Sequence, residues 1–435
     1  MPVTDKPTFT EAFSYWLKLG FVSFGGPTGQ IAMLHKEVVE KKKWMDEEHF
    51  LQALNFCMLL PGPEAQQLAT YIGWLMHRTM GGIMAGVLFV LPSVFILWGL
   101  SYLYASFGNI PSVSAFFYGL KPAVTAIVAE AVIRIGKKSL KNGIFVGLAA
   151  ASFIGIYFLK APFPFIVLLA GIIGYLGGIY APGKFSPAKP KPGIKDSGPT
   201  LISQLSGDTQ TQTGWSRSLK VLAVCLIIWF LPMILLGLWR GWNDIFIDIG
   251  ILFSKAAIVT FGGAYSVLAY VSQQAVEHYG WLKPEQMMDG LGLAETTPGP
   301  LIMVNQFVGY MAAFTQAQGL TPGAAGAIGG LLTTWVTFAP SFLMIFLGAP
   351  YIERIRGNIR IGSALSAITA AVVGVVLSLG VTFTYHTLLP EGAGFDWYAL
   401  VASIVAFAGM QFFTWGMIPV IFGSAMAGFI WKIIA

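Results

Sequence analysis

Charged residues are scarce in this sequence. Asp, Glu, Lys and Arg make up only 11% of its 435 residues, whereas an ordinary soluble domain carries about 25%. So few charges cannot cover the surface of a water-soluble body of this size, and the shortage excludes a cytosolic enzyme and a disordered chain. The net charge of +6 is mild, and nucleic acid is not expected as a partner.

Cysteine and histidine are equally sparse. The two cysteines, Cys57 and Cys225, lie in apolar runs, so we interpret them as small core residues rather than disulfide partners or metal ligands. The five histidines show no metal-binding spacing, and no Gly-x-x-x-x-Gly-Lys-Ser/Thr loop for ATP is found. We therefore expect no metal, no cofactor and no enzymatic activity.

Hydrophobic residues, in contrast, make up 55% of the chain, and the mean hydropathy is +0.70. A helix needs about 20 apolar residues to cross the hydrocarbon core of a bilayer. Nine uninterrupted apolar segments approach or exceed this length, at residues 81–106, 111–135, 143–158, 163–180, 219–238, 323–347, 361–383, 397–413 and 415–434. With four interrupted segments, they predict an all-α polytopic membrane protein with about thirteen hydrophobic segments.

The four interrupted segments come in two kinds. Gly-Gly breaks stand at residues 24–27 and 261–264, and Pro-Gly-Pro breaks at 61–63 and 298–300. Both kinds stop an α-helix, because proline removes an N–H donor and glycine gives up conformational restraint. A constant shift of 237 residues places the second break of each kind on the first, which indicates an internal duplication.

The duplication divides the chain. The same shift aligns Lys18 with Lys255 and Trp44 with Trp281. The segment 181–217 is rich in Pro, Lys, Gly, Ser and Thr, as expected for a solvated linker. The predicted organisation is a first transmembrane repeat at 1–180, a polar cytoplasmic linker at 181–217, a connecting span at 218–240 and a second repeat at 241–435.

The loop charges predict that the two repeats have opposite orientations, because Lys and Arg accumulate on the cytoplasmic side. The first repeat is basic at residues 41–43, at Arg78 and at 134–141. In the second repeat the loops at 277–289 and 391–396 are acidic, and the basic loop is at 354–360. Basic residues flank the first Pro-Gly-Pro break on both sides, so this segment is expected to enter and return. The prediction is an inverted-topology pair with broken or re-entrant helices.

Inverted repeats with paired broken helices are typical of secondary transporters, whose site lies at the repeat interface. A half-helix that begins after a break has unpaired N–H groups and a positive dipole end, which suit an anion. The alternative is that glycine and proline only bend helices for packing. The candidate substrate-binding residues at the breaks are Ser23, Gly25, Gly26, Pro27, Thr28, Gly62, Pro63, Thr260, Gly262, Gly263, Ala264, Thr297, Gly299, Pro300 and Asn305.

Three lysines within apolar runs are candidate charge partners of the anion. Lys18 and Lys255 each stand six residues before a Phe-Gly-Gly sequence. Lys121 lies in another apolar run and has no equivalent in the second repeat. Ionisable residues inside a membrane are costly and are usually functional. The alternative is that the amines extend to the membrane surface.

Two carboxylates adjoin the Pro-Gly-Pro breaks. Glu64 follows the first break and Glu295 stands three residues before the second. In a low-dielectric segment such a group can hold a proton, so both are candidates for proton coupling. For Glu64 the alternative is a favourable charge at a helix N-terminus.

These motifs resemble the chromate ion transporter family in its long two-repeat form. The resemblance rests on Phe24-Gly25-Gly26-Pro27 and on residues 60–65, 71–74, 260–265, 294–301 and 306–310. It implies a bacterial inner-membrane protein that exports chromate, or a related tetrahedral divalent oxyanion such as sulfate, driven by the proton-motive force. The alternatives are an oxyanion channel and a sulfate or chromate uptake transporter. An enzyme acting on lipid would need a nucleophile–base pair or metal cluster, which we do not find.

The sequence also gives expectations for the location. The N-terminal residues are polar, and the first apolar stretch lacks a small-residue cleavage site, so no signal peptide is expected. The N-terminus and the linker are predicted to be cytoplasmic and the C-terminus periplasmic. The expected partners are the oxyanion, protons and the lipid bilayer; a homodimer is left open.

Overall fold

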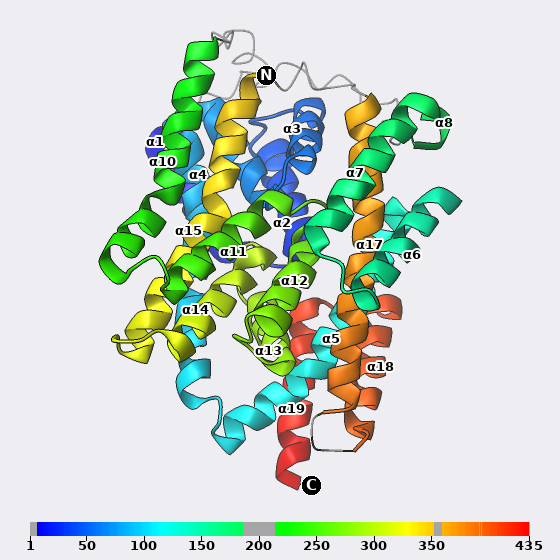
Figure 1. Ribbon diagram of the computed structural model, residues 1–435. Coiled ribbons are helices and arrows are strands. Elements are labelled where there is room, and N and C mark those ends of the chain that lie inside the picture. The colour runs from blue at the N-terminus through cyan, green and yellow to red at the C-terminus, as the bar shows by residue number, and fades with distance from the viewer. Residues whose placement is uncertain (1–6, 186–213, 352–358, 391, 393, 435) are drawn as a thin grey trace.

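A computed structural model describes residues 7–185, 214–351, 359–390, 392 and 394–434. Within these residues the chain forms helices and no β-strand (Figure 1). Seven of the helices are long and apolar enough to cross a membrane, and α6 (Gly143–Tyr157) and α18 (Trp397–Phe412) are shorter apolar helices. The predicted all-α polytopic fold is confirmed, whereas the total of about thirteen segments stays a prediction.

The helices follow the predicted segments closely. The first half contains α1 (Phe9–Val22), α2 (Gly26–His35), the π-helical η1 (Lys36–Lys41), α3 (Glu47–Leu59), α4 (Glu64–Phe107), α5 (Pro111–Ser139), α6, α7 (Phe163–Tyr180) and α8 (Pro182–Phe185). The second contains α10 (Trp215–Arg240), α11 (Ile245–Val259), α12 (Ala264–Ser272), η2 (Gln273–His278), α13 (Pro284–Thr296), η3 (Leu301–Met303), α14 (Val304–Gln316), α15 (Pro322–Gly348), η4 (Ala349–Tyr351), α17 (Ile359–Leu388), α18 and α19 (Met417–Ile434). Most of the predicted linker, and Arg354 and Arg356 of the basic loop, lie outside the described residues.

The Gly-Gly breaks separate α1 from α2 and α11 from α12. Gly25 and Gly26 have φ angles of 89° and 65°, and Gly262 and Gly263 have 78° and 98°. Glycine adopts these values without steric cost, so each break needs its glycine pair. After the first break the chain returns to α1, where the rings of Trp44 and Tyr15 lie 5.0 Å apart between centroids.

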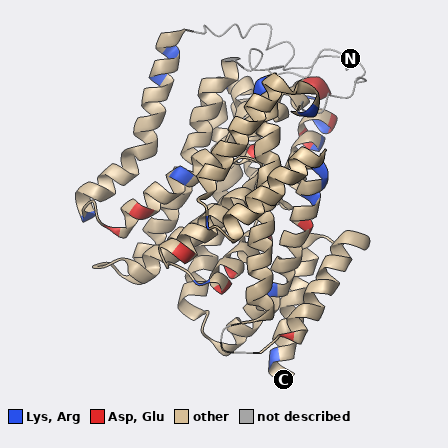
Figure 2. Cartoon of the chain, turned by 45° about the vertical axis from the view of Figure 1, so that its right-hand side comes forward, with Lys and Arg blue, Asp and Glu red and all other residues tan. Residues whose placement is uncertain are grey.

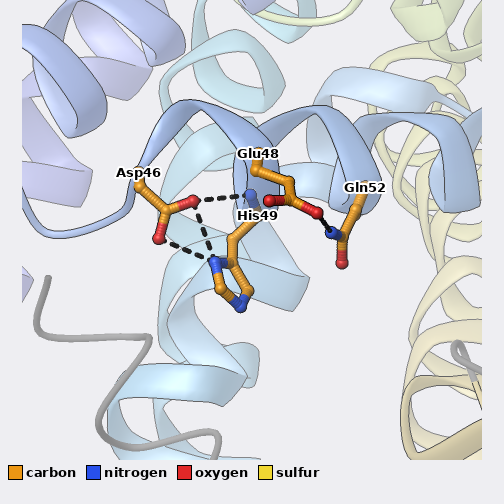
Figure 3. Close-up of polar contacts among 4 residues, drawn as sticks. All are labelled: Asp46, Glu48, His49 and Gln52. Carbon is orange, nitrogen blue, oxygen red and sulfur yellow. Dashed lines mark hydrogen bonds and ion pairs between the residues drawn. The ribbon is translucent and has the colours of Figure 1, made fainter. Parts of the chain in front are cut away.

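The first Pro-Gly-Pro break lies between α3 and α4. Asp46 caps the start of α3, because its carboxylate accepts a hydrogen bond from the backbone N–H of His49 at 2.8 Å (Figure 3). The same carboxylate contacts His49 Nδ1, and Gln52 donates to Glu48 one turn further on (Figure 3). The helix ends before Pro61, which cannot donate a hydrogen bond.

Helix α4 folds back on itself. His77 and Arg78 have non-helical backbone angles, and the φ of Arg78 is 54°. A Cβ atom on Gly73 would collide with the carbonyl oxygen of Gly81, so the segments on either side of the bend pack in direct contact. His77 Nε2 contacts the carbonyl oxygen of Pro7 at 3.0 Å, which places the bend beside the start of α1. The first part of α4 thus lies between two interruptions, the Pro-Gly-Pro break and this bend, and a re-entrant course through the membrane stays a prediction.

The second repeat repeats this arrangement with α13, α14 and α15. A Cβ on Gly309 of α14 would overlap the hydroxyl of Thr333 on α15, so these two helices also pack closely. The long helices of the two halves run in opposite directions in Figure 1. Helix α4 ends at the bottom of the view whereas α15 ends at the top, and α5 rises whereas α17 descends.

Lys, Arg, Asp and Glu occupy only scattered short stretches of the ribbon (Figure 2). Many large apolar side chains of the outer helices, such as Leu168 of α7 and Ile227 of α10, are exposed. An apolar outer surface of this kind is expected where lipid, rather than water, surrounds a helix.

Candidate functional site

The four breaks meet in reciprocal pairs. The backbone N–H of Gly62 donates to the carbonyl oxygen of Thr260 at 2.9 Å, and that of Gly299 donates to the carbonyl oxygen of Ser23 at 2.8 Å. Each Pro-Gly-Pro break thus holds the Gly-Gly break of the other repeat. We call the segments 23–28, 61–64, 260–265 and 297–301 together the central crossing.

Two serines on the long helices complete this exchange. Ser93 of α4 donates its hydroxyl hydrogen bond to the carbonyl oxygen of Pro298. Its counterpart Ser341 of α15 lies next to the first Pro-Gly-Pro break. The Oγ of Ser341 would be 2.8 Å from a Cβ atom added to Gly62. Both serines follow a proline within a helix. Each repeat therefore supports the Pro-Gly-Pro break of the other repeat.

Several predicted anion ligands already have protein partners. The N–H groups of Gly62 and Gly299 are used in the reciprocal bonds. The hydroxyl of Thr260 donates to the Ala256 carbonyl at 2.6 Å, and that of Ser23 donates to the Gly20 carbonyl at 3.4 Å. The hydroxyl of Thr297 is likewise turned toward its own helix α13. These groups hold the crossing together in this conformation.

The half-helix starts differ between the repeats. At the start of α2, Gly25 and Thr28 are exposed, and Gly26 and Pro27 are partly exposed. At the equivalent start of α12, Ala264 is buried, as is the next residue, Tyr265, while Gly262 and Gly263 are partly exposed. At the Pro-Gly-Pro breaks only the first proline shows this bias, because Pro298 is buried and Pro61 is partly exposed, whereas the glycine and second proline of both breaks are buried. The first repeat therefore presents the more open half of the crossing.

Two buried amide side chains contact the crossing, and a third follows it closely in the chain. Gln30 donates to the carbonyl oxygens of both Ser23 and Gly299, and Gln67 donates to that of Pro61 at 2.7 Å. Asn305 is only 1% exposed, and within the described residues neither atom of its amide has a hydrogen-bond partner. An unpaired buried amide is costly, which makes Asn305 available to a ligand. No sequence pattern distinguishes Gln30 as a site residue.

Lys18 and Lys255 do not reach the crossing. Both are exposed, on the flanks of α1 and α11. In the described part of the chain, neither ammonium group forms a hydrogen bond or an ion pair. An exposed acid stands seven residues before each, Glu11 and Asp248, so each helix carries an acid and a lysine on its accessible side.

The remaining charged candidates lie elsewhere around α4, α5 and α13. Lys121 interacts electrostatically with Asp289 of α13. Glu64 is the first residue of α4, is partly exposed, and interacts with Lys138. Glu295 is 5% exposed and accepts a hydrogen bond from the Tyr265 hydroxyl at 2.6 Å.

Glu295 also has a cationic partner, Arg134, whose place in the sequence suggests only a loop charge. Arg134 acts electrostatically on Glu295, and its Nη1 is 3.3 Å from Glu130 Oε2. The i, i+4 spacing of Glu130 and Arg134 in an apolar run was the available sequence signal. Tyr265 gave no such signal. Within the described residues, no three His, Cys, Asp or Glu side chains gather as metal ligands would.

Comparison with known proteins identifies the family to which this chain belongs. A family model described as "Chromate transporter" matches residues 10–175 and 247–429. The chromate transport protein of Cupriavidus metallidurans is 28% identical over 383 residues, which cover 86% of this chain and 82% of that protein. That of Pseudomonas aeruginosa is 28% identical over 86% of this chain and 80% of its own length. An uncharacterized transporter of Methanocaldococcus jannaschii is 26% identical over 99% of this chain and 96% of its own. No solved structure matches.

Proposed function

Because this chain belongs to the chromate transporter family, we propose that it is a secondary active exporter of chromate or of a related tetrahedral divalent oxyanion such as sulfate. The proton-motive force of the bacterial inner membrane drives the export. The observation that carries this proposal is the central crossing, where Gly62 and Gly299 exchange hydrogen bonds with Thr260 and Ser23 of the opposite repeat. Within the membrane, non-helical backbone is tolerated where it lines a binding cavity or is buried in protein.

The reciprocal bonds support an inverted repeat. Equivalent atoms of the two repeats make equivalent contacts across one centre, and α4 and α15 run in opposite directions (Figure 1). In such a transporter, one repeat rocks against the other around a fixed site. The open start of α2 and the closed start of α12 suit one end state of this motion. The N-terminus and the linker then face the cytoplasm and the C-terminus the periplasm.

The anion binds where the half-helices begin. The first-turn N–H groups of α2 and α12 supply directed donors, and the amide of Asn305 supplies another. A dianion that loses its hydration must gain charge and oriented donors in return. Lys18 and Lys255 supply positive charge from opposite repeats, so each lysine moves toward the crossing when its side opens.

Protons exchange at Glu64 and Glu295 during the cycle. Glu295 is buried beside the crossing, and Glu64 begins the half-helix that follows the first Pro-Gly-Pro break. The protonation state of a carboxylate depends on its burial and on neighbouring charges, so it changes when the surroundings of the carboxylate change during the cycle. Release of a proton on one side and uptake on the other link the proton gradient to anion export.

The substrate class is tested by exchange in proteoliposomes. Vesicles containing the purified protein are loaded with unlabelled chromate, sulfate or chloride, and uptake of radiolabelled chromate is followed. We expect internal chromate and sulfate to accelerate uptake and chloride to have no effect. Equal acceleration by chloride would contradict an oxyanion site. With the membrane potential clamped at zero, an oxyanion channel, the alternative function, would show no acceleration by any internal anion.

A further inference from the structure

Helix α13 carries two buried carboxylates that each receive a tyrosine hydroxyl. Tyr104 of α4 donates to Asp289 Oδ2 at 2.9 Å, and Tyr265 of α12 donates to Glu295 Oε1 at 2.6 Å. Both carboxylate residues are 5% exposed. The other oxygen of Asp289, Oδ1, is buried and has no hydrogen-bond partner among the described residues. A buried carboxylate oxygen without a donor is the place where a proton binds most readily.

Each of these acids has a cationic partner on α5. Lys121 acts electrostatically on Asp289, and Arg134 acts on Glu295. Helices α5 and α13 pack against each other, and along both helices the pairs follow in the same order. The interface between the repeats therefore contains two similar units, each with a buried acid, a base and a tyrosine.

A second acid accompanies each unit. Glu285 stands one turn before Asp289, acts on it, and lies 3.6 Å from His386 Nδ1 of α17. Glu130 of α5 pairs with Arg134 at 3.3 Å and acts on Glu295. Each buried acid thus has a second carboxylate acting on it, and two negative charges in one site favour one bound proton in each unit.

Several other titratable groups on the packed helices have partners of their own. Tyr310 of α14 interacts with Tyr102. Lys432 of α19 lies over the ring of Tyr118, whose hydroxyl donates to Asp396 at the start of α18. These groups act on one another rather than on Asp289 or Glu295.

We propose that the α5–α13 interface is a proton pathway in which Asp289 passes protons between Glu285 with His386 at one end and Glu295 at the central crossing. This inference rests on the proposed proton-coupled transport and names the route. A proton binds the Asp289 carboxylate, leaves it for Glu295, and is released there, with no other bond made or broken. Six residues separate the two acids on α13, which is about 9 Å along the helix axis. Bridging this distance takes water between the helices or a change of side-chain rotamer.

The test compares coupled and uncoupled transport in Asp289→Asn. The amide keeps the shape and the contact with Tyr104 but does not carry a proton. We expect chromate uptake driven by a pH gradient to fall at least about tenfold, whereas chromate–chromate exchange, which needs no net proton movement, is retained. Proton flux, followed with a pH-sensitive dye, should be lost together with gradient-driven uptake.

Asp396→Asn is the matched control, because Asp396 also accepts a tyrosine hydroxyl, at 2.8 Å, and lies outside α5 and α13. Asparagine remains a good helix cap there, so coupling should equal that of the wild type. Wild-type proton flux in folded Asp289→Asn would overturn the pathway. A wild-type protein that transports without any dependence on the pH gradient would instead overturn the proposed coupling itself.

A second variant covers the case in which Asp289→Asn does not fold. Tyr104→Phe removes the hydroxyl that stabilises the charged form of Asp289. Asp289 would then keep its proton to higher pH, and the midpoint of the pH profile of transport should move upward. An unshifted profile in Tyr104→Phe would contradict the pathway.

Discussion

The central crossing can be perturbed at Gly299 without touching a charged group. The φ of Gly299 is 102°, and an added Cβ would overlap the hydroxyl oxygen of Ser93. A left-handed backbone costs an L-residue about 1–2 kcal/mol, and overpacking a fitted core adds about 1–3 kcal/mol. We therefore expect Gly299→Ala to destabilise the protein by about 2–5 kcal/mol and to impair transport.

A matched control separates strain from overlap. Gly241 has a φ of 97°, and nothing lies within 4 Å of where its Cβ would stand. Gly241→Ala should therefore show only the backbone strain, about 1–2 kcal/mol. Thermal unfolding of the purified variants in the same detergent measures the difference as a lower apparent Tm for Gly299→Ala.

Ser93 provides the second half of a double-mutant cycle. Ser93→Ala leaves the buried carbonyl oxygen of Pro298 without its donor, at a cost of about 1–3 kcal/mol. In the double variant with Gly299→Ala, most of the overlap disappears and the hydrogen bond is lost only once. The combined loss should thus be smaller than the sum by about 1–3 kcal/mol. Additive losses, or equal effects of Gly299→Ala and Gly241→Ala, would refute the contact at the crossing.

Three further predictions concern the anion, the proton and the orientation. Lys18→Gln and Lys255→Gln should each weaken oxyanion binding to the purified protein by tenfold or more, about 1.4 kcal/mol; wild-type affinity in both folded variants would show that the lysines are not ligands. Glu64→Gln should abolish the dependence of uptake on a pH gradient while equilibrium binding of chromate stays detectable. Unchanged coupling in this variant would show that Glu64 only stabilises the N-terminus of its helix. Single cysteines placed at Lys43 and at Glu277 should react with a membrane-impermeant reagent from opposite sides of the membrane, and labelling from the same side would contradict the inverted repeat.

Much of the fold follows from local sequence signals. Helix α7 has the predicted ends, residues 163 and 180, because a proline precedes it and the apolar run stops with it. Basic residues on both sides of the first Pro-Gly-Pro break predicted a segment that enters and returns. In the structure α3 ends and α4 begins at this break, and α4 bends again at Arg78; a re-entrant course through the membrane stays a prediction. Short-range signals of this kind depend on residues that are neighbours in the chain.

The contacts that make the site do not follow from such signals. Ser93 and Pro298 are far apart in sequence, and their hydrogen bond depends on how two long helices are placed. The same holds for Tyr265 with Glu295, where a tyrosine in an apolar run looks like a core residue. Repeat alignment found the breaks in matching pairs, but it did not predict that each break would hold the opposite kind in the other repeat.

The most direct test of the account is uphill transport of chromate by the purified protein. Proteoliposomes with an acidic lumen are placed in a neutral buffer containing radiolabelled chromate, so that protons leaving the vesicle drive the anion inward by exchange. The account predicts that internal chromate rises above the external concentration and that a protonophore abolishes this accumulation. Internal chromate that only equilibrates with the buffer, with or without the pH gradient, would contradict secondary active transport and leave an oxyanion channel.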